Sequence, residues 1–225
     1  EIAAQKPIAI RCCTAAGCLS SGSQGVVDAL CSAVDQQGLK DRVSVQSVGC
    51  MKLCCAGPLV EVTGKPTIYE KVEARQASAI VQAVRDNTTA DVPQIDPNMP
   101  FFKEQMPLVL ENSGIVEPER IESYLARGGY QALHMALREM TPQQVIQAVT
   151  QSGLRGRGGA GYPTGVKWSL VSKIPAPNKY VVCNADEGDP GAFMDRSVLE
   201  SDPHRVLEGM AIAAFAVGAN QGMAR

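Results

Sequence analysis

The chain has 225 residues, 45% of them hydrophobic, and its 21 basic and 23 acidic side chains give a net charge of −2. It is long enough for one large domain or two modest ones with ordinary buried cores. The balanced charge creates no field that would attract nucleic acid or an anionic membrane, so neither partner is indicated. The longest apolar stretch, Met210–Ala219, is about half of what a roughly 20-residue membrane span needs.

The first 86 residues alternate short strand-like and helix-like patterns in the order β-α-β-β-β-α. The predicted strands cover residues 7–11, 42–48, 59–62 and 67–69, and the predicted helices cover residues 24–35 and 74–85. The first two strands are expected to be parallel and adjacent, because a crossover helix joins them. This order predicts a thioredoxin-like layout.

Two pairs of cysteines follow the first two predicted strands. Four residues separate Cys13 from Cys18, and three separate Cys50 from Cys54. Neighbouring strand ends lie about 5 Å apart in a sheet, so the two loops are expected to bring four thiolates to one point. Four thiolates are the ligand set of an iron–sulfur cluster.

The metal and the ligand register have alternatives. Thiolate sulfur suits zinc as well as iron–sulfur clusters, and an unmetallated buried set is a third reading. The spacing favours a 2Fe-2S cluster, because structural zinc sites usually use two-residue knuckles, narrower than these loops. Cys12 and Cys55 adjoin the proposed ligands, so the choice between neighbouring cysteines stays open. Cys31 and Cys183 are expected in the core.

Cysteine usage also bears on the redox compartment. Adjacent cysteines rarely reach good bridging geometry, so disulfides are disfavoured and a reducing cytoplasm is predicted. The chain contains no C-x-x-C motif, which argues against a thiol–disulfide oxidoreductase.

Residues 87–115 are predicted to be a linker, because prolines are frequent there and apolar periodicity is weak. The predicted organisation is therefore a thioredoxin-like 2Fe-2S domain at 1–86, the linker, and a second α/β domain at 116–225. Thr141 before Pro142 predicts a helix N-cap. The second domain is expected to contain helices at 117–125, 130–139, 142–151, 166–172 and about 203–217, with one strand at 179–183.

A glycine-rich loop covers residues 153–165. Its segment Gly156–Gly161 matches the letters of G-x-G-x-x-G, but that fingerprint must follow a strand, and here a predicted helix precedes it. The glycines still allow close backbone approach to a flat or phosphorylated ligand, and Arg155, Arg157 and Lys167 supply positive charge. A plain flexible loop is the alternative.

An acidic loop, Asn184–Gly188, follows the last predicted strand at its carboxyl end, where open α/β sheets bind ligands. Asn184, Asp186 and Glu187 offer amide and carboxylate groups for ribityl or ribose hydroxyls. Taken alone, these acids indicate a solvated turn. Beside the glycine-rich loop they indicate a nucleotide site. A nucleotide site together with the predicted iron–sulfur cluster indicates an electron-transfer flavoprotein.

These residues carry a family resemblance. Ser152–Trp168 and Asn184–Arg196 resemble the FMN and NADH binding signature of the flavoprotein subunit of respiratory complex I and its relatives. Arg11–Cys18 and Gly49–Pro58 resemble the thioredoxin-like 2Fe-2S module of the same machinery. Because the two modules resemble separate subunits in complex I, their fusion points to the soluble branch. The doubled cysteines most resemble the diaphorase subunit of NAD-linked bidirectional nickel–iron hydrogenases, with bifurcating hydrogenases and NAD-dependent formate dehydrogenases as alternatives.

The resemblance implies hydride exchange between NAD(P)H and FMN, with single electrons passed to iron–sulfur clusters on other diaphorase and hydrogenase subunits. It implies no acid–base side chain, and His134 and His204 are expected to be ordinary helix residues. Tyr162 occupies the place of an aromatic ring over the nicotinamide, and Asp189 stands where Glu is frequent. Positive charge or a match to the family's signature places ten residues at the expected cofactor site. They are Gly156, Arg157, Gly158, Gly159, Tyr162, Lys167, Asn184, Asp186, Glu187 and Gly188.

Residues 116–225 are expected to be the N-terminal part of a larger FMN-binding domain. An α/β domain needs a sheet of several strands, and only one strand is predicted in this segment. The last helix would leave Met210, Ile212, Phe215 and Val217 facing water. Such a chain should hold the first cluster but turn NADH over poorly by itself. A rival of another class is a non-catalytic iron–sulfur relay or assembly subunit.

Overall fold

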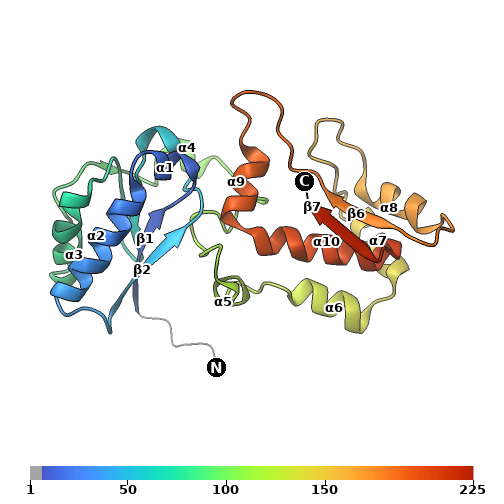
Figure 1. Ribbon diagram of the computed structural model, residues 1–225, viewed down its shortest axis with the longest axis horizontal. Helices are drawn as coiled ribbons and strands as arrows, with labels where there is room; N and C mark the ends of the chain where they lie inside the picture. The colour runs from blue at the N-terminus through green and yellow to red at the C-terminus, as the bar shows by residue number, and fades with distance from the viewer. Residues whose placement is uncertain (1–6, 225) are drawn as a thin grey trace. The chain divides into compact units, whose positions relative to one another are not determined.

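The computed structural model describes residues 7–224 (Figure 1). Contacts divide the chain into two units, each with a core of its own. Unit 1 comprises Glu1–Tyr124 with Ser197–Asp202, and unit 2 comprises Leu125–Arg196 with Pro203–Arg225. Within residues 7–224, no helix is both long enough and apolar enough to cross a membrane.

Unit 1 is built on one mixed sheet with the strand order β2-β1-β3-β4-β5. β1 and β2 are parallel and adjacent, with Cys13 opposite Val48, and the other pairs are antiparallel. The predicted thioredoxin-like layout is confirmed. The strands are β1 (Ile8–Cys13), β2 (Val43–Val48), β3 (Val60–Val62), β4 (Ile68–Tyr69) and β5 (Gln94–Ile95).

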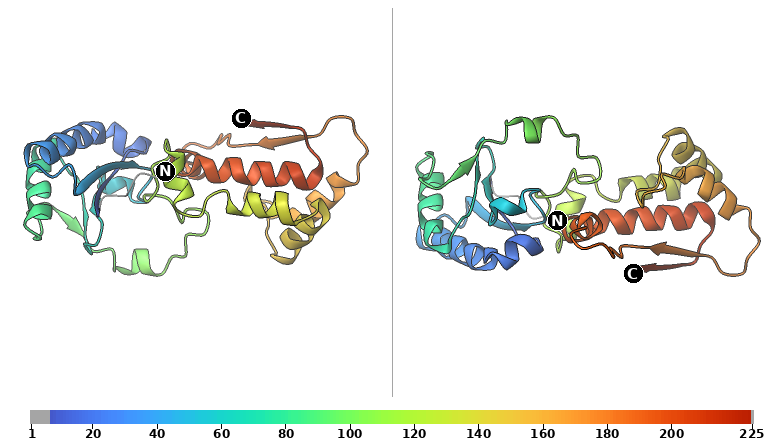
Figure 2. Two further views of the ribbon diagram at one scale, coloured as in Figure 1. Left: turned by 90° about the horizontal axis from the view of Figure 1, so that it is seen from below. Right: turned by 90° about the horizontal axis from the view of Figure 1, so that it is seen from above.

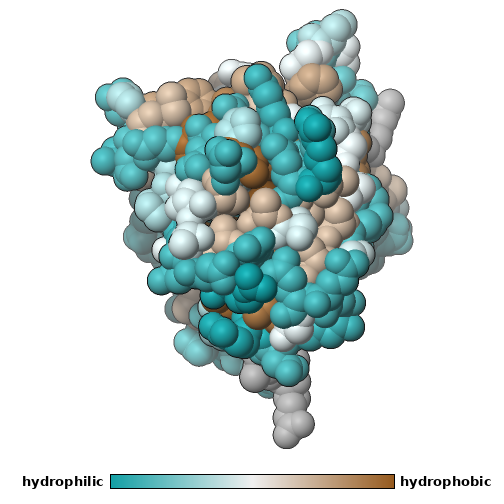
Figure 3. Space-filling view, turned by 90° about the vertical axis from the view of Figure 1, so that its left-hand side faces the viewer, coloured by the Kyte–Doolittle hydropathy of each residue, from teal (hydrophilic) through white to brown (hydrophobic). Residues whose placement is uncertain are grey.

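Two helices, α2 (Ser23–Gln36) and α3 (Ala77–Arg85), lie side by side against the sheet (Figures 1 and 2). Their apolar stripes meet the strands in one core, where Ile10, Leu30 and Ile80 are fully buried. Burial of each such side chain stabilises the fold by about 1.5–3 kcal/mol. The side of unit 1 that carries these helices is largely hydrophilic at its surface (Figure 3).

Several local features of unit 1 differ from the sequence expectation. Cys31 is exposed rather than in the core, because the buried stripe of α2 centres on Leu30 and residue 31 lies about 100° further round the helix. β5 and the short α4 (Pro100–Lys103) form inside the predicted linker, where β5 extends the sheet by pairing with β4. Short turns also form inside the cysteine loops, namely α1 (Ala16–Ser20) and the 3-10 turn η1 (Cys54–Ala56); a second 3-10 turn, η2 (Ala74–Gln76), precedes α3.

Unit 2 packs its helices around α10 (Pro203–Val217). The Thr141 cap is confirmed: its Oγ1 accepts the Gln144 N–H at 3.3 Å, and Gln144 Oε1 accepts the Thr141 N–H at 2.7 Å. Such a capping box satisfies two otherwise orphan donors. The other helices are α5 (Ile121–Leu125, which straddles the two units), α6 (Gln131–Glu139), α7 (Pro142–Gln151) and α8 (Thr164–Ser172).

Two expectations about the end of the chain are wrong within the described residues. The strand β6 (Tyr180–Cys183) does not stand alone, because β7 (Gln221–Ala224) pairs with it in parallel. The apolar side of α10 is covered as well: Val217 is buried, and Ile212 and Phe215 pack on a cluster that includes Ala136 and Val145. Cover for α10 comes from α6, α7 and α8.

One buried carboxylate organises unit 2. Glu208 of α10 is only 7% exposed, and its two oxygens accept the N–H groups of Tyr130 at 2.8 Å and Leu133 at 3.0 Å. These donors lie at the start of α6, where helix N–H groups lack intrahelical partners. The side chain of His204, in the same helix as Glu208, lies 3.0 Å from the Tyr130 hydroxyl. Both histidines are helix residues, as expected.

Candidate functional site

The first part of the site is built from the loops that follow β1 and β2. The Thr14 N–H donates to the Val48 carbonyl at 2.8 Å, so the parallel pairing continues up to both cysteine loops. Cys13 and Cys18 are almost completely buried, Cys50 is 9% exposed, and Cys54 is exposed. Adjacent parallel strand ends therefore hold the two loops together, as the spacing predicts.

The four cysteines contact one another in two pairs. Cys13 donates a hydrogen bond to Cys18, and Cys50 is hydrogen-bonded to Cys54. The charge on Cys54 also interacts with Cys18. The structure thus brings together the four thiols that the sequence analysis proposed as ligands, although their role as ligands stays a prediction.

Two glycines let the loops approach this closely. A β-carbon at Gly57 would lie 2.7 Å from Cys18 Sγ, and one at Gly17 would lie 3.3 Å from Cys54 Sγ. A separation below 3.0 Å is far inside van der Waals contact, so only glycine fits at position 57. Sequence reasoning missed Gly57, although it follows the second cysteine pair closely.

The pKa values of these thiols reflect their mutual contacts. The hydrogen bond with Cys18, followed by burial, raises the pKa of Cys13, and the same hydrogen bond lowers the pKa of Cys18. Burial raises the pKa of Cys54, and the charge of Cys50 adds to the rise. These mutual shifts show that the thiols of each pair interact with each other. Metal binding would deprotonate them, because cysteine ligates as the thiolate.

The neighbouring cysteines are placed differently. Cys12 lies in the core with α2, where its Sγ is 3.9 Å from the Ser23 carbonyl, and burial raises its pKa to about 12. Successive strand residues point to opposite faces, so Cys12 and Cys13 cannot both face the loop cluster. Cys55 lies in η1 and is exposed. This geometry favours the register with Cys13.

The donor set fits a binuclear cluster. Among residues 7–224, no group of three or more His, Cys, Asp or Glu side chains is placed to hold a single metal ion. A 2Fe-2S cluster does not require three side chains around one ion, because its four thiolates are divided into two pairs, one pair on each iron. The pairs Cys13 with Cys18 and Cys50 with Cys54 have that arrangement.

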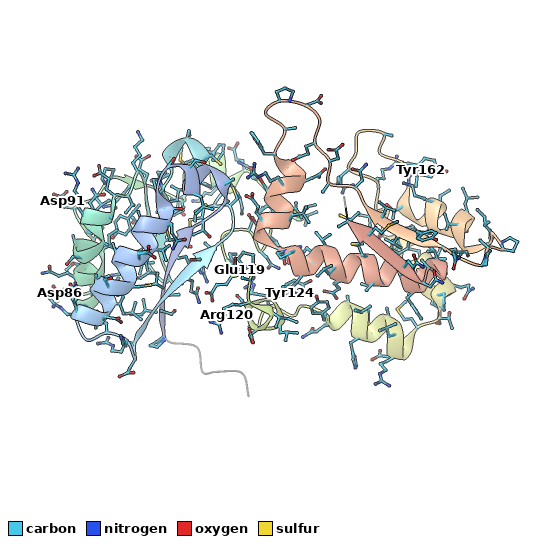
Figure 4. All side chains as sticks on the ribbon, in the orientation of Figure 1. Asp86, Asp91, Glu119, Arg120, Tyr124 and Tyr162 are labelled. Carbon is cyan, nitrogen blue, oxygen red and sulfur yellow. The ribbon has the colours of Figure 1, made fainter. Side chains whose placement is uncertain are left out.

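The second part of the site lies in unit 2, where the glycine-rich loop joins α7 to α8. Its base is closed by an antiparallel bridge between Arg155 and Pro163 and by the Gly156 N–H, which donates to the Tyr162 carbonyl at 2.9 Å. A helix precedes the loop, as predicted, so it is no dinucleotide fingerprint. Figure 4 shows Tyr162 on this loop, and its side chain is 46% exposed.

The tip of the loop offers open space along a bare backbone. A β-carbon added at Gly158, Gly159 or Gly161 would meet no atom within 4 Å. Gly159 and Gly161 have φ values of 102° and 60°, which favour glycine. Lys167 is exposed in the first turn of α8. A flat or phosphorylated ligand could therefore lie against this backbone with cations at hand.

The acidic loop follows β6 and is organised by its own side chains. Asn184 Oδ1 accepts the Asp186 N–H at 3.1 Å. The two oxygens of Glu187 accept the N–H groups of Asp195 at 2.8 Å and Arg196 at 3.2 Å, at the start of α9 (Met194–Ser201). A carboxylate is favourable at a helix N-terminus, so Glu187 holds the loop in place. The side chains of the loop reach solvent at least in part.

Comparison with known proteins identifies both parts. The profile of the thioredoxin-like [2Fe-2S] ferredoxin family matches residues 3–85, and the profile of the Nuo51 FMN-binding domain matches residues 149–224. The NADP-reducing hydrogenase subunit HndC of Solidesulfovibrio fructosivorans is 53% identical over 120 residues, which are 53% of this chain and 24% of that protein. A subunit of the NADH-quinone oxidoreductase of Rhizobium meliloti (strain 1021) is 50% identical over 113 residues, which are 50% of this chain and 27% of that protein.

Among solved structures, an NAD+-reducing [NiFe]-hydrogenase in the air-oxidized state is 25% identical, with 97% of this chain and 37% of that chain covered. The TM-score of that superposition is 0.41. The chain spans about a quarter of the length of the curated relatives it matches.

A ferredoxin domain and an FMN-binding domain on one chain define an iron–sulfur flavoprotein, whose cofactors are a 2Fe-2S cluster and FMN. The chain thus combines a thioredoxin-like [2Fe-2S] ferredoxin domain with a Nuo51-type FMN-binding segment, and it is similar to subunits of an NADP-reducing hydrogenase and of an NADH-quinone oxidoreductase.

Proposed function

We propose that this chain is part of a diaphorase subunit that exchanges hydride between NAD(P)H and FMN and passes single electrons to iron–sulfur clusters. The observation that carries the proposal is the presence on one chain of four converging cysteines and an open glycine-rich loop. The matches to a ferredoxin and to an FMN-binding domain support it.

The cluster ligands in this proposal are Cys13, Cys18, Cys50 and Cys54. Their pairwise contacts support the assignment, as does the burial of Cys12 on the opposite face of β1. The loops exclude water from three of the four thiols, and buried clusters hold their electrons in a low-dielectric surrounding.

For the flavin site, we propose that Gly156, Gly158 and Gly159 present bare backbone to the ring or phosphate. Arg157 and Lys167 supply positive charge for the phosphate. FMN, when bound, supplies the conversion between a hydride pair and single electrons. The polar side chains and backbone that would orient the ribityl chain are Asn184, Asp186, Glu187 and Gly188.

Tyr162 is proposed to stack on the nicotinamide. Its ring is about half exposed, so a flat cationic ring could cover it without displacing a packed neighbour. No side chain is assigned as acid or base, because hydride passes directly between the two ring systems.

The functional domains are proposed to be residues 1–86 for the cluster, 87–115 as the connection and 116–225 for the flavin. We propose a reducing compartment such as the cytoplasm, where cysteine thiolates stay available as cluster ligands; none of the eight cysteines, all within the described range, forms a disulfide. The proposed partners are hydrogenase and diaphorase subunits that carry iron–sulfur clusters. The resemblance to a hydrogenase subunit favours them over formate dehydrogenase partners.

The test is cofactor analysis of the purified chain under anaerobic conditions. We expect acid treatment to release FMN, identified by chromatography, and we expect two irons and two sulfides per chain. Because this chain is expected to turn NADH over poorly by itself, NADH or NADPH should bleach the flavin absorbance only slowly. Recovery of FAD, or purified protein that binds no flavin, would overturn the proposal.

The rival function is that of an iron–sulfur relay or assembly subunit without nucleotide turnover. It predicts two irons per chain and no flavin band. The glycine-rich loop with its adjacent cations argues against this rival, because a relay without nucleotide turnover does not need bare backbone and positive charge arranged for a phosphate.

A further inference from the structure

Both backbone polar groups of Cys50 are held by serine hydroxyls from distant segments. The Cys50 N–H donates to Ser201 Oγ at 2.9 Å, and Ser113 Oγ donates to the Cys50 carbonyl at 2.6 Å. The two hydroxyl oxygens are 3.1 Å apart. Ser113 gives its one proton to the carbonyl, so Ser201 donates to Ser113. The hydrogen bonds close a ring through the two serines and the backbone of a single cysteine.

This serine ring is sealed from water. Ser201 is fully buried and Ser113 is 4% exposed. A β-carbon at Gly49 would lie 2.3–2.4 Å from atoms of Ser201, so residue 49 must be glycine for the two segments to meet. Charge-neutral hydrogen bonds in such a dry setting are strong, and the loss of one leaves a costly unsatisfied partner.

The residues on either side of Ser201 tie the same segment down. Glu200 Oε2 accepts the Ala16 N–H at 3.1 Å, so the segment also contacts the first cysteine loop. Asp202 Oδ2 accepts the side-chain N–H of Asn112 at 2.7 Å, and both residues are buried. Residues 200–202 therefore form a strap, with one hydrogen bond to each cysteine loop and one to the segment that carries Ser113.

The side chain of Cys50 is held as well. The Lys52 N–H points at Cys50 Sγ over 3.2 Å, and Lys52 has a φ of 71°, a conformation that residues other than glycine rarely adopt. Strain of this kind persists only where the surroundings enforce it. The serine ring supplies that constraint from the other side of Cys50.

We propose that Ser201 and Ser113 are positioning residues for the 2Fe-2S cluster, and that they set its reduction potential and spectrum by fixing Cys50. The inference rests on the proposed ligand role of Cys50. Neither serine lies in the segment that matches the ferredoxin profile, residues 3–85, and Ser201 lies in the segment that matches the FMN-binding domain. The ferredoxin fold of this chain thus depends on outside residues for the geometry of one cluster ligand.

The test compares Ser201→Ala, Ser113→Ala and Gly49→Ala in the 225-residue chain with the cluster bound. Ser32→Ala is the matched control, because the Ser32 hydroxyl bonds to the Asp28 carbonyl on the exposed side of α2. The readouts are the EPR g-values of the reduced cluster, its midpoint potential and the rate of iron release to a chelator. Circular dichroism reports whether each variant is folded.

We expect the three variants to shift the g-values and the midpoint potential away from the wild type, and to release iron about tenfold faster. Ser32→Ala should match the wild type in all three. Gly49→Ala displaces Ser201 by steric contact, so Ser201→Ala added to it should change nothing further.

Wild-type spectra, potentials and release rates in folded Ser201→Ala and Ser113→Ala would overturn the inference and leave the cluster proposal standing. A wild-type chain that binds no cluster after reconstitution would instead overturn the cluster proposal, and the inference with it. Should one serine variant fail to fold, the other and Gly49→Ala decide the question by the same readouts.

Discussion

Gly165 in α8 lies directly against the backbone of Thr150 in α7: a β-carbon at position 165 would come within 2.6 Å of Thr150 Cα. We expect Gly165→Ala to destabilise unit 2 by about 1–3 kcal/mol, because the helices must separate to admit the methyl group. Chemical unfolding followed by circular dichroism measures the change in the free energy of unfolding.

The control for this variant is Gly209→Ala in α10, where a β-carbon meets no atom within 4 Å. Alanine is favoured over glycine inside a helix, so this change should stabilise the chain by about 1 kcal/mol. Equal effects of the two variants would contradict the close packing of α7 on α8.

Cys13→Ser should abolish the visible absorption of the cluster, whereas Cys12→Ser should keep it. The reason is that Cys12 lies in the core with α2, while Cys13 faces Cys18. Cys12→Ser buries a hydroxyl and should cost about 1–3 kcal/mol of stability without loss of iron. Cys54→Ser and Cys55→Ser form a second matched pair with the same expected contrast. The opposite pattern in either pair would show that the ligand register is shifted by one residue.

Gly158→Val should lower FMN affinity by about tenfold or more without unfolding the chain. A β-carbon at position 158 meets no protein atom within 4 Å, so we expect the added side chain to extend into the space proposed for the ligand. Fluorescence titration of FMN measures the affinity, and the free energy of unfolding without FMN should stay within about 0.5 kcal/mol of the wild type. An unchanged affinity would show that the flavin binds elsewhere.

Glu117→Gln should stabilise unit 1 at neutral pH and have no effect in acid. Burial raises the pKa of Glu117 above its ordinary value of 4.5, and the exposed Arg120 at 3.8 Å opposes this only in part. A raised folded-state pKa means that the wild type loses stability as pH rises from 4.5 through the folded value. Glutamine does not ionise and escapes that loss. Unfolding of the wild type and of Glu117→Gln should be measured side by side at several pH values. The difference in their free energies of unfolding should grow as pH rises, and a difference that stays constant with pH would contradict the prediction.

Much of the fold could be predicted because its signals are local. The apolar period of residues 24–35 and the Thr141-Pro142 cap each concern one helical turn or one helix face, and both helices form as expected. The cysteine spacing likewise follows two strands whose parallel pairing is implied by the crossover helix. The thioredoxin-like layout, the two loops and their four cysteines were therefore determined by the sequence itself.

Only the tertiary structure decided the contacts that join distant segments. Ser201 meets Cys50 across 151 residues and Ser113 meets it across 63, and a lone serine carries no periodic signal. The same holds for β7, which becomes a strand by pairing with β6, and for Gly57, whose missing β-carbon admits Cys18. Such contacts depend on which surfaces pack together, and that is settled by burial of the whole core rather than by local propensity.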